Sequence, residues 1–209
     1  MLIKPRLLVV AGCNGSGKST FSSILTDSSV IPFDYDKRFI EIYKTLQDFD
    51  LKDAMCHNKT RTILDDAVEN SINKNIDFCY ETNFNSTPMY WINKFKENGY
   101  SIEMVFFCLD STDEAIKRVQ IRFESGGHFV PYDEIKKRFN FGYSNLDANF
   151  IYFDRVELFD SSGYNITPIH IVSLANKEVT TISKYPVFLE ILLPNITSLV
   201  NGYLKAKQS

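Results

Sequence analysis

The chain has 209 residues, which is enough for one α/β domain with a buried sheet, or for one domain plus a small appendage. Hydrophobic residues make up 44% and charged residues 23%, as in ordinary globular proteins, and no apolar run approaches the roughly 18 residues of a membrane span. The net charge of −3 gives no electrostatic reason to expect general binding to nucleic acids.

The first predicted strand, residues 6–11, leads directly into a glycine-rich segment. Residues 12–19 fit the pattern G-x-x-x-x-G-K-[ST] at every fixed position, and residues 18–25 can continue as a helix. This order is typical of a phosphate-binding loop, in which backbone N–H groups and a helix N-terminus surround phosphate oxygens. Lys18 would reach the β- and γ-phosphates as a catalytic residue, and the Ser19 hydroxyl would hold Mg²⁺. We therefore expect ATP or GTP to bind through Gly12, Asn14, Gly15, Ser16, Gly17, Lys18, Ser19 and Thr20.

Strand and helix signals alternate over the first 160 residues. Further strands are predicted at residues 29–33, 76–81, 102–109 and 156–160, and helices at residues 37–47, 59–73, 89–97, 113–124 and 133–146. The alternation predicts a parallel sheet with right-handed crossovers, and so a three-layer αβα sandwich of the P-loop NTPase type.

After residue 160 the pattern changes. Residues 166–173 and 178–182 predict a hairpin, and residues 185–205 an amphipathic helical segment that is broken or kinked at Pro194. We expect a single domain over residues 1–209, with a core of residues 6–162 and a small C-terminal appendage of residues 163–209.

Two carboxylates, Asp34 and Asp36, follow the second predicted strand. Because ligands of parallel sheets bind at the carboxyl ends of the strands, both side chains are expected in the site. Asp36 is the candidate catalytic base, which would accept the proton of an attacking hydroxyl, and Asp34 would orient substrate or a metal-bound water. The alternative is that Asp36 only caps the helix that follows.

The third strand ends in Glu81, Thr82 and Asn83. An acid, a hydroxyl and an amide at a strand terminus can bind a polyol or a sugar through hydrogen bonds. The same three residues suit an ordinary turn equally well, so substrate binding and a turn both stay open here.

A helix carrying Arg122, a hinge of Gly126 and Gly127, and a second helix with Arg138 predict a helical lid. Arginine neutralises the charge of a transferring phosphoryl group and can bind its oxygens in a fork, so both arginines are candidate catalytic residues. The alternative for either is a surface salt bridge. His128 is a candidate for substrate binding, or equally a hydrogen-bonded structural residue of the loop.

The four cysteines, Cys13, Cys56, Cys79 and Cys108, are far apart and lack C-x-x-C spacing, which is typical of reduced thiols. The residues before Cys13 superficially resemble a lipoprotein cleavage site, but their apolar stretch of about five residues is too short for a signal peptide. We therefore expect a cytoplasmic protein.

In these motifs, residues 6–162 resemble the zeta-toxin family of P-loop kinases. The resemblance rests on the phosphate loop, the Asp34/Asp36 segment, Glu81-Thr82-Asn83, Arg122, the Gly-Gly-His-x-Val-Pro segment of residues 126–131 with Arg138, and the Leu-Phe-Asp-Ser-Ser segment of residues 158–162. It implies that Asp36 activates a substrate hydroxyl and that the lid arginines stabilise the γ-phosphate. Well-studied members phosphorylate UDP-N-acetylglucosamine and are held off by an antitoxin, so the resemblance implies a nucleotide-sugar acceptor and an antitoxin partner.

The chain departs from the family pattern in three places. Cys13 stands where proline is common, Asn83 where the family has the last threonine of Glu-Thr-Thr, and Ser161 where it has asparagine. Because Asn83 lies in the expected substrate pocket, the identity of the acceptor stays open, whereas phosphoryl transfer does not depend on it. The alternatives are a nucleoside, nucleic-acid-end or antibiotic kinase, and a nucleotide-binding interaction protein without chemistry.

Overall fold

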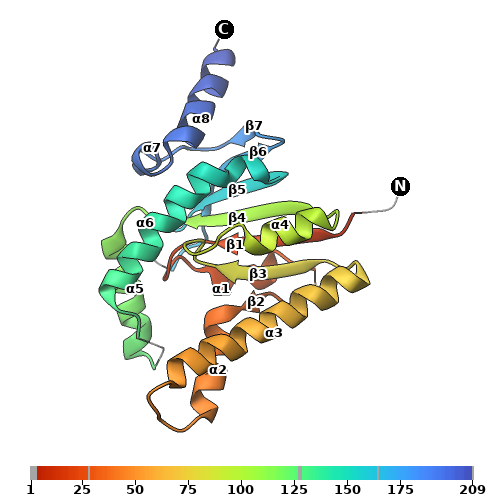
Figure 1. Cartoon of the computed structure of the whole chain (residues 1–209). Helices are drawn as coiled ribbons and strands as arrows, with labels where there is room; N and C mark the ends of the chain where they lie inside the picture. The colour runs from red at the N-terminus through yellow and green to blue at the C-terminus, as the bar shows by residue number, and fades with distance from the viewer. Residues whose placement is uncertain (1–3, 28, 127–128, 164, 209) are drawn as a thin grey trace.

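The computed structural model describes residues 4–27, 29–126, 129–163 and 165–208. Within them, seven strands form one sheet in the spatial order β2-β3-β1-β4-β5-β6-β7, which runs from bottom to top in Figure 1. Strands β1 to β5 pair in parallel, and β6 and β7 extend the sheet antiparallel. The predicted α/β class with a mostly parallel sheet is confirmed. The strands are β1 (Arg6–Ala11), β2 (Phe33–Asp34), β3 (Phe78–Thr82), β4 (Ser101–Cys108), β5 (Arg155–Asp160), β6 (Ile169–Ala175) and β7 (Glu178–Ile182).

Helices cover both faces of this sheet, but unequally. The side chains of α3, α4, α6 and α8 pack in one large core on the face turned to the viewer in Figure 1, whereas α1 and η1 lie against the other face. The second helical layer is therefore present but thin. The helices are α1 (Lys18–Phe21), η1 (Ser22–Ile24), α2 (Tyr35–Thr45), α3 (Lys52–Lys74), α4 (Tyr90–Glu97), α5 (Thr112–Glu124), α6 (Tyr132–Asn149), η2 (Phe150–Tyr152), α7 (Phe188–Leu192) and α8 (Pro194–Ala206).

The central strand β1 supplies side chains to both cores. Leu7 and Val9 enter the large core, while Leu8 and Val10 enter a smaller cluster on the other face, and all four are at most 3% exposed. Burial on both faces explains why β1 and β4 are almost continuously apolar in sequence. It also holds the carboxyl end of β1, where the phosphate loop begins, at the middle of the sheet.

The second strand is not where the sequence predicted it. β2 comprises only Phe33 and Asp34 rather than residues 29–33, because Pro32 has no N–H to donate and Val30 packs into the smaller cluster. The next helix begins at Tyr35, since the Asp34 carboxylate caps it by accepting from the backbone N–H of Lys37 at 3.0 Å. The alternative that Asp36 is the cap is therefore wrong.

Two other helices differ from the prediction in length. α3 begins at Lys52, two turns before residue 59, and its buried face continues through Cys56 and Thr60 to Leu64. Because Cys56 and Thr60 are not large apolar residues, the helical period of apolar residues does not show in this part of the sequence. The helix predicted for residues 18–25 is α-helical only to Phe21 and ends as the 3-10 turn η1.

The C-terminal hairpin joins the main sheet through β6, which pairs with β5. Its tight turn contains Asn176 and Lys177, both with positive φ (51° and 71°), a backbone suited to two-residue hairpins. The predicted break at Pro194 is confirmed, because α7 ends at Leu192 and α8 begins at Pro194.

α6 holds the start of α8. The carboxylate of Asp147, 6% exposed, accepts hydrogen bonds from the backbone N–H groups of Asn195 and Ile196, each at 3.0 Å. These bonds satisfy donors in the first turn of α8 that have no partner within the helix.

Among the described residues, no helix has both the length and the apolar character needed to cross a bilayer.

Candidate functional site

The phosphate loop links β1 to α1 with a backbone that only glycine adopts readily. Gly12, Gly15 and Gly17 have φ values of 141°, 80° and 93°. A Cβ on Gly12 would lie 2.6 Å from a backbone carbonyl oxygen of β4, so no side chain fits there. The Ser16 hydroxyl is buried and has no hydrogen-bond partner among the described residues. A close backbone approach and an unpaired buried hydroxyl fit the phosphate oxygens of a bound nucleotide.

Lys18 turns back onto this loop. Its Nζ donates to the carbonyl oxygens of Gly12 at 2.7 Å and Cys13 at 3.0 Å, and to Oδ1 of Asn83 at 3.0 Å, which uses all three donors of the ammonium group. Burial lowers the pKa of Lys18, and the nearby carboxylates of Asp36 and Glu81 act in the opposite direction. Lys18 thus lies between the loop and the carboxylates of Glu81 in β3 and Asp36 in α2.

Three oxygen-bearing side chains meet beside Lys18. The Ser19 hydroxyl lies 3.0 Å from Oδ2 of Asp34 and 2.6 Å from Oε2 of Glu81, whose other oxygen accepts from the Ser22 hydroxyl at 2.7 Å. Burial raises the pKa of Glu81, while the hydrogen bonds from the two serines oppose that shift. One hydroxyl and two carboxylates form the kind of oxygen-donor set that Mg²⁺ binds, directly or through water. These residues therefore fit a magnesium ion next to the phosphate loop.

Asp34 and Asp36 have different surroundings. Asp34 caps α2 and contacts Ser19, so its position suits the metal side of the site rather than direct contact with an acceptor. Asp36, in the first turn of α2, makes no hydrogen bond or ion pair with any residue that the structure describes, and it lines the same cleft. An unengaged carboxylate in a cleft can accept a proton from a bound hydroxyl.

The loop after β3 is fixed by α6. The Thr82 hydroxyl accepts from the backbone N–H of Phe84 at 2.9 Å. Thr82 therefore takes part in a turn, which is one of the two alternatives that the sequence left open. Phe84 is fully buried with φ 56°, an unusual backbone for a bulky residue. Asn145 donates to its carbonyl oxygen at 2.9 Å, and Gly142 lets α6 approach the carbonyl of Asn83. The Asn83 side chain, which contacts the phosphate loop, is positioned by these contacts.

The two predicted lid arginines lie on α5 and α6. Arg138 is held by Glu134, at 2.9 Å, and donates to Oδ1 of Asn14 in the phosphate loop at 3.2 Å. Arg122 lines the cleft and makes no hydrogen bond or ion pair within the described part of the chain. Within the described residues, neither arginine forms a salt bridge with a residue outside the cleft. His128 lies outside the described residues.

Arg118 is an arginine that the sequence analysis did not single out. Glu114 holds its Nε at 2.6 Å, and its terminal nitrogens donate to the carbonyl oxygens of Gly15 at 3.3 Å, Ser161 at 2.8 Å and Ser162 at 2.7 Å. The side chain therefore ties the phosphate loop to the segment after β5. The i, i+4 spacing of Glu114 and Arg118 was visible in the sequence, but their carbonyl partners were not.

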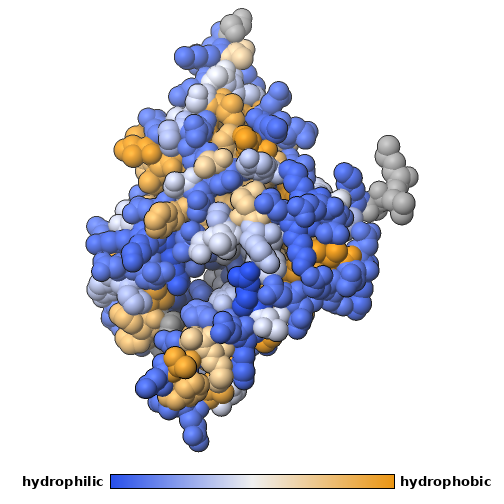
Figure 2. All heavy atoms as spheres, viewed as in Figure 1, coloured by the Kyte–Doolittle hydropathy of each residue, from blue (hydrophilic) through white to orange (hydrophobic). Residues whose placement is uncertain are grey.

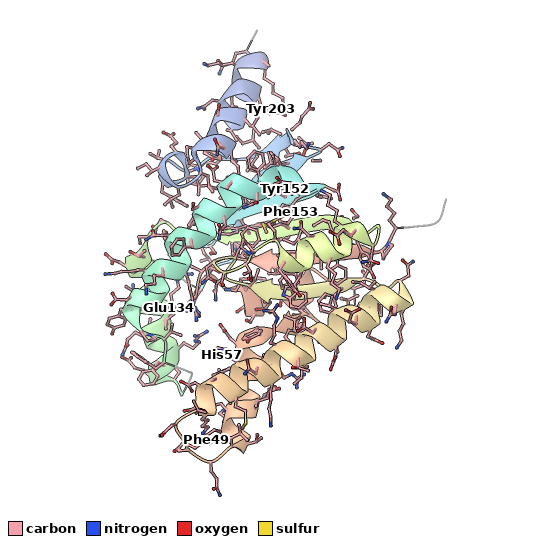
Figure 3. The ribbon with its side chains drawn as sticks, in the orientation of Figure 1. Phe49, His57, Glu134, Tyr152, Phe153 and Tyr203 are labelled. Carbon is pink, nitrogen blue, oxygen red and sulfur yellow. The ribbon has the colours of Figure 1, made fainter. Side chains whose placement is uncertain are left out.

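These elements surround one open cleft of about 1650 Å³. Figure 2 shows this face hollowed near its middle, with mostly hydrophilic residues around the hollow, and in Figure 3 His57 of α3 and Glu134 of α6 lie on opposite sides of it. Of the predicted site residues that the structure describes, Gly12 does not line the cleft, and those that do are Asn14, Gly15, Ser16, Gly17, Lys18, Ser19, Thr20, Asp34, Asp36, Glu81, Thr82, Asn83, Arg122 and Arg138.

The far wall of the cleft was missed by the sequence analysis. It is formed by side chains of α2, α3 and α4, among them Tyr35, His57, Arg61 and Trp91. The residues after β5 that line the other end, such as Asn165 and Pro168, were also missed. These residues belong to no motif, and only the packing of the helices brings them together.

The chain is similar to several known proteins. The sequence profile of a family described as zeta toxin matches residues 2–168. An uncharacterised protein of Haemophilus influenzae is 27% identical over 139 residues, which cover 66% of this chain and 95% of that protein.

Solved structures resemble the fold at low sequence identity. A chain of the PezAT chromosomal toxin–antitoxin system of Streptococcus pneumoniae superposes with a TM-score of 0.60 at 14% identity, covering 94% of this chain and 88% of that one. A chain of the AvrRxo1-ORF1:AvrRxo1-ORF2 complex gives 0.63 at 15% identity, covering 92% and 65%. That complex has also been solved with ATP, and the matching chain there gives 0.59 at 15% identity, covering 86% and 61%.

Proposed function

Since the chain belongs to the zeta toxin family of P-loop kinase-like phosphotransferases, we propose that it transfers the γ-phosphoryl group of ATP or GTP to a hydroxyl of a small molecule. The observation that carries the proposal is the joining of three features in one cleft. These are a phosphate loop with its lysine, the unengaged carboxylate of Asp36, and the arginines of the lid helices α5 and α6. A protein that only binds nucleotide needs neither the free carboxylate nor the arginines.

Each residue has a role in this proposal. Ser19, Asp34 and Glu81 would hold Mg²⁺, and the bound magnesium nucleotide would supply the phosphoryl group. Lys18 exchanges its loop carbonyls for phosphate oxygens, because these carry more negative charge. Asp36 holds the acceptor hydroxyl in line and takes its proton.

On the lid, Arg122 and Arg138 stabilise the charge that develops on the transferring group. Such positioning and charge stabilisation carry most of the catalysis in phosphoryl transfer.

We propose a nucleotide sugar such as UDP-N-acetylglucosamine as the acceptor, and an antitoxin protein as a partner. Membership of the zeta toxin family supports both, and the likeness to a chain of the PezAT toxin–antitoxin system supports the partner. The acidic balance of the chain gives no support to a nucleic acid substrate.

Mass spectrometry of the purified chain incubated with Mg-ATP or Mg-GTP and a pool of nucleotide sugars tests this function. We expect one acceptor to gain the mass of a phosphate. Asp36→Asn should lower turnover by at least about 100-fold, the lower end of what general base catalysis contributes, while nucleotide binding stays near normal. Asp50→Asn, at the exposed α2–α3 connection, is the matched control and should keep full activity.

Two results would contradict the proposal in different ways. Unchanged turnover in Asp36→Asn would remove the role of that residue, and tight nucleotide binding with no product from any acceptor would favour the non-catalytic interpretation.

A further inference from the structure

Four arginines line the cleft within the described residues, and they differ in how their donors are used. Arg118 donates to three backbone carbonyl oxygens, and Arg138 to Glu134 and Asn14. Arg122 and Arg61 donate no hydrogen bond to any residue that the structure describes. These two come from different walls, Arg122 from α5 on the lid and Arg61 from α3. The proposed function assigns the two lid arginines, Arg122 and Arg138, to the transferring phosphate, so Arg61 remains to be explained.

Arg61 is held in place by aromatic rings rather than by hydrogen bonds. Its guanidinium carbon lies 4.8 Å from the ring centres of both Tyr90 and Trp91, and Trp91 is only 9% exposed. Nε lies 3.5 Å from a carboxylate oxygen of Asp65, one helical turn away, and 46% of the side chain is exposed to solvent. Cation–π contacts of this kind hold the guanidinium beside the rings without using its N–H donors.

Arg61 and the proposed base both lie near Tyr35. Tyr35, the neighbour of Asp36 in sequence, donates its hydroxyl to the carbonyl oxygen of His57 at 3.1 Å, and His57 precedes Arg61 by one helical turn. Burial raises the pKa of Tyr35, and the charges of both Arg61 and Asp36 act on its hydroxyl, in opposite directions. Tyr35 and His57 therefore line the part of the cleft shared by Asp36 and Arg61.

We propose that Arg61 is a specificity-determining residue that binds an acidic, phosphate-type group on the acceptor, at a distance from the hydroxyl that is phosphorylated. This inference rests on the proposed function. The planar guanidinium can bind two oxygens of such a group side by side. Asp65 balances the charge of Arg61 while the site is empty. Neutral nucleosides and cationic antibiotics would leave the guanidinium donors unpaired, so they are poorer acceptors.

Binding of inorganic pyrophosphate tests the site without turnover. Calorimetric titration is done on the full chain, saturated with Mg²⁺ and a non-hydrolysable ATP analogue so that the phosphate loop is filled. We expect wild type to bind pyrophosphate and Arg61→Met to bind it at least about tenfold more weakly, as expected for charge-assisted hydrogen bonds. Arg61→Lys keeps the charge but not the fork, and should fall between them. Arg155→Met is the matched control, because Arg155 pairs with Glu157 on β5 and neither residue lines the cleft, and it should bind as wild type does.

Absence of pyrophosphate binding to wild type, or equal binding by Arg61→Met, would overturn the inference. With an acceptor found by mass spectrometry, Arg61→Met should raise the acceptor KM with kcat nearly unchanged, whereas a loss of kcat alone would also count against it. Failure of the proposed function is recognised separately, as binding of the ATP analogue and of pyrophosphate without phosphoryl transfer to any acceptor.

Discussion

Replacing Gly142 by alanine measures how closely α6 packs on the loop after β3. In a helix interior, glycine to alanine normally stabilises a protein by about 1 kcal/mol. At Gly142 the new Cβ would lie 2.7 Å from the backbone carbonyl oxygen of Asn83, which cannot rotate away as a side chain end could. Overpacking costs about 1–3 kcal/mol, so the net loss of unfolding free energy should reach about 2 kcal/mol. Gly202, in α8, has nothing within 4 Å of its Cβ position, and Gly202→Ala should gain about 1 kcal/mol.

Urea unfolding followed by circular dichroism measures both variants on the same scale. The two free energies of unfolding should differ by about 1–3 kcal/mol, with Gly142→Ala the less stable. Gly142→Ala should also lower phosphoryl transfer, because a shifted Asn83 no longer meets Lys18. If both variants are stabilised equally, α6 has room at Gly142 and our account of this loop is refuted.

Three further predictions concern other contacts. Arg118→Met should cost about 2–3 kcal/mol in urea unfolding and weaken nucleotide binding, since three carbonyl oxygens lose their donor; unchanged nucleotide affinity would contradict this. Asp147→Ala should cost about 1–2 kcal/mol by uncapping α8, and an unchanged melting temperature would count against it. Burial raises the pKa of Cys13 from 9.0 to about 11. The unfolded chain therefore loses this proton first as pH rises, and stability should fall by up to about 3 kcal/mol between pH 9 and 11. Cys13→Ala should flatten that loss in denaturant titrations at several pH values, and an unaltered slope would be evidence against the buried thiol as its cause.

The sequence predicted the fold where local signals agree. The side chains of Leu7 to Val10 alternate between two buried cores. Every residue of this stretch is therefore apolar, and the run ends at a glycine loop. The prediction was wrong where a tertiary contact decides, as for Val30, which leaves the second strand to pack behind the sheet. It was also incomplete for α3, where Cys56 and Thr60 occupy buried positions that an apolar pattern does not mark.

In the candidate site, too, residues marked by local signals were predicted and residues placed by tertiary contacts were not. The phosphate loop and Asp36 follow strand ends, and the topology of a parallel sheet brings such ends to one edge. Arg61 and His57 lie in the middle of a helix, in a stretch with no motif, and their place in the cleft depends on how α3 packs beside α2 and α4. Asp34 lies where the sequence predicted it, but its bond to Ser19 and its capping of α2 required the structure.

The contacts of α6 limit how its length can change. Arg138, Gly142 and Asn145 lie within about 60° of one another around the helix axis, and Asp147 lies about 180° from Arg138. One stripe therefore meets the phosphate loop and the loop after β3, while the opposite stripe caps α8. Deleting one residue between Arg138 and Gly142 would rotate everything beyond it by about 100° and shorten it by about 1.5 Å. Related chains should vary freely in the sequence of this helix but hardly at all in the number of residues between these contacts.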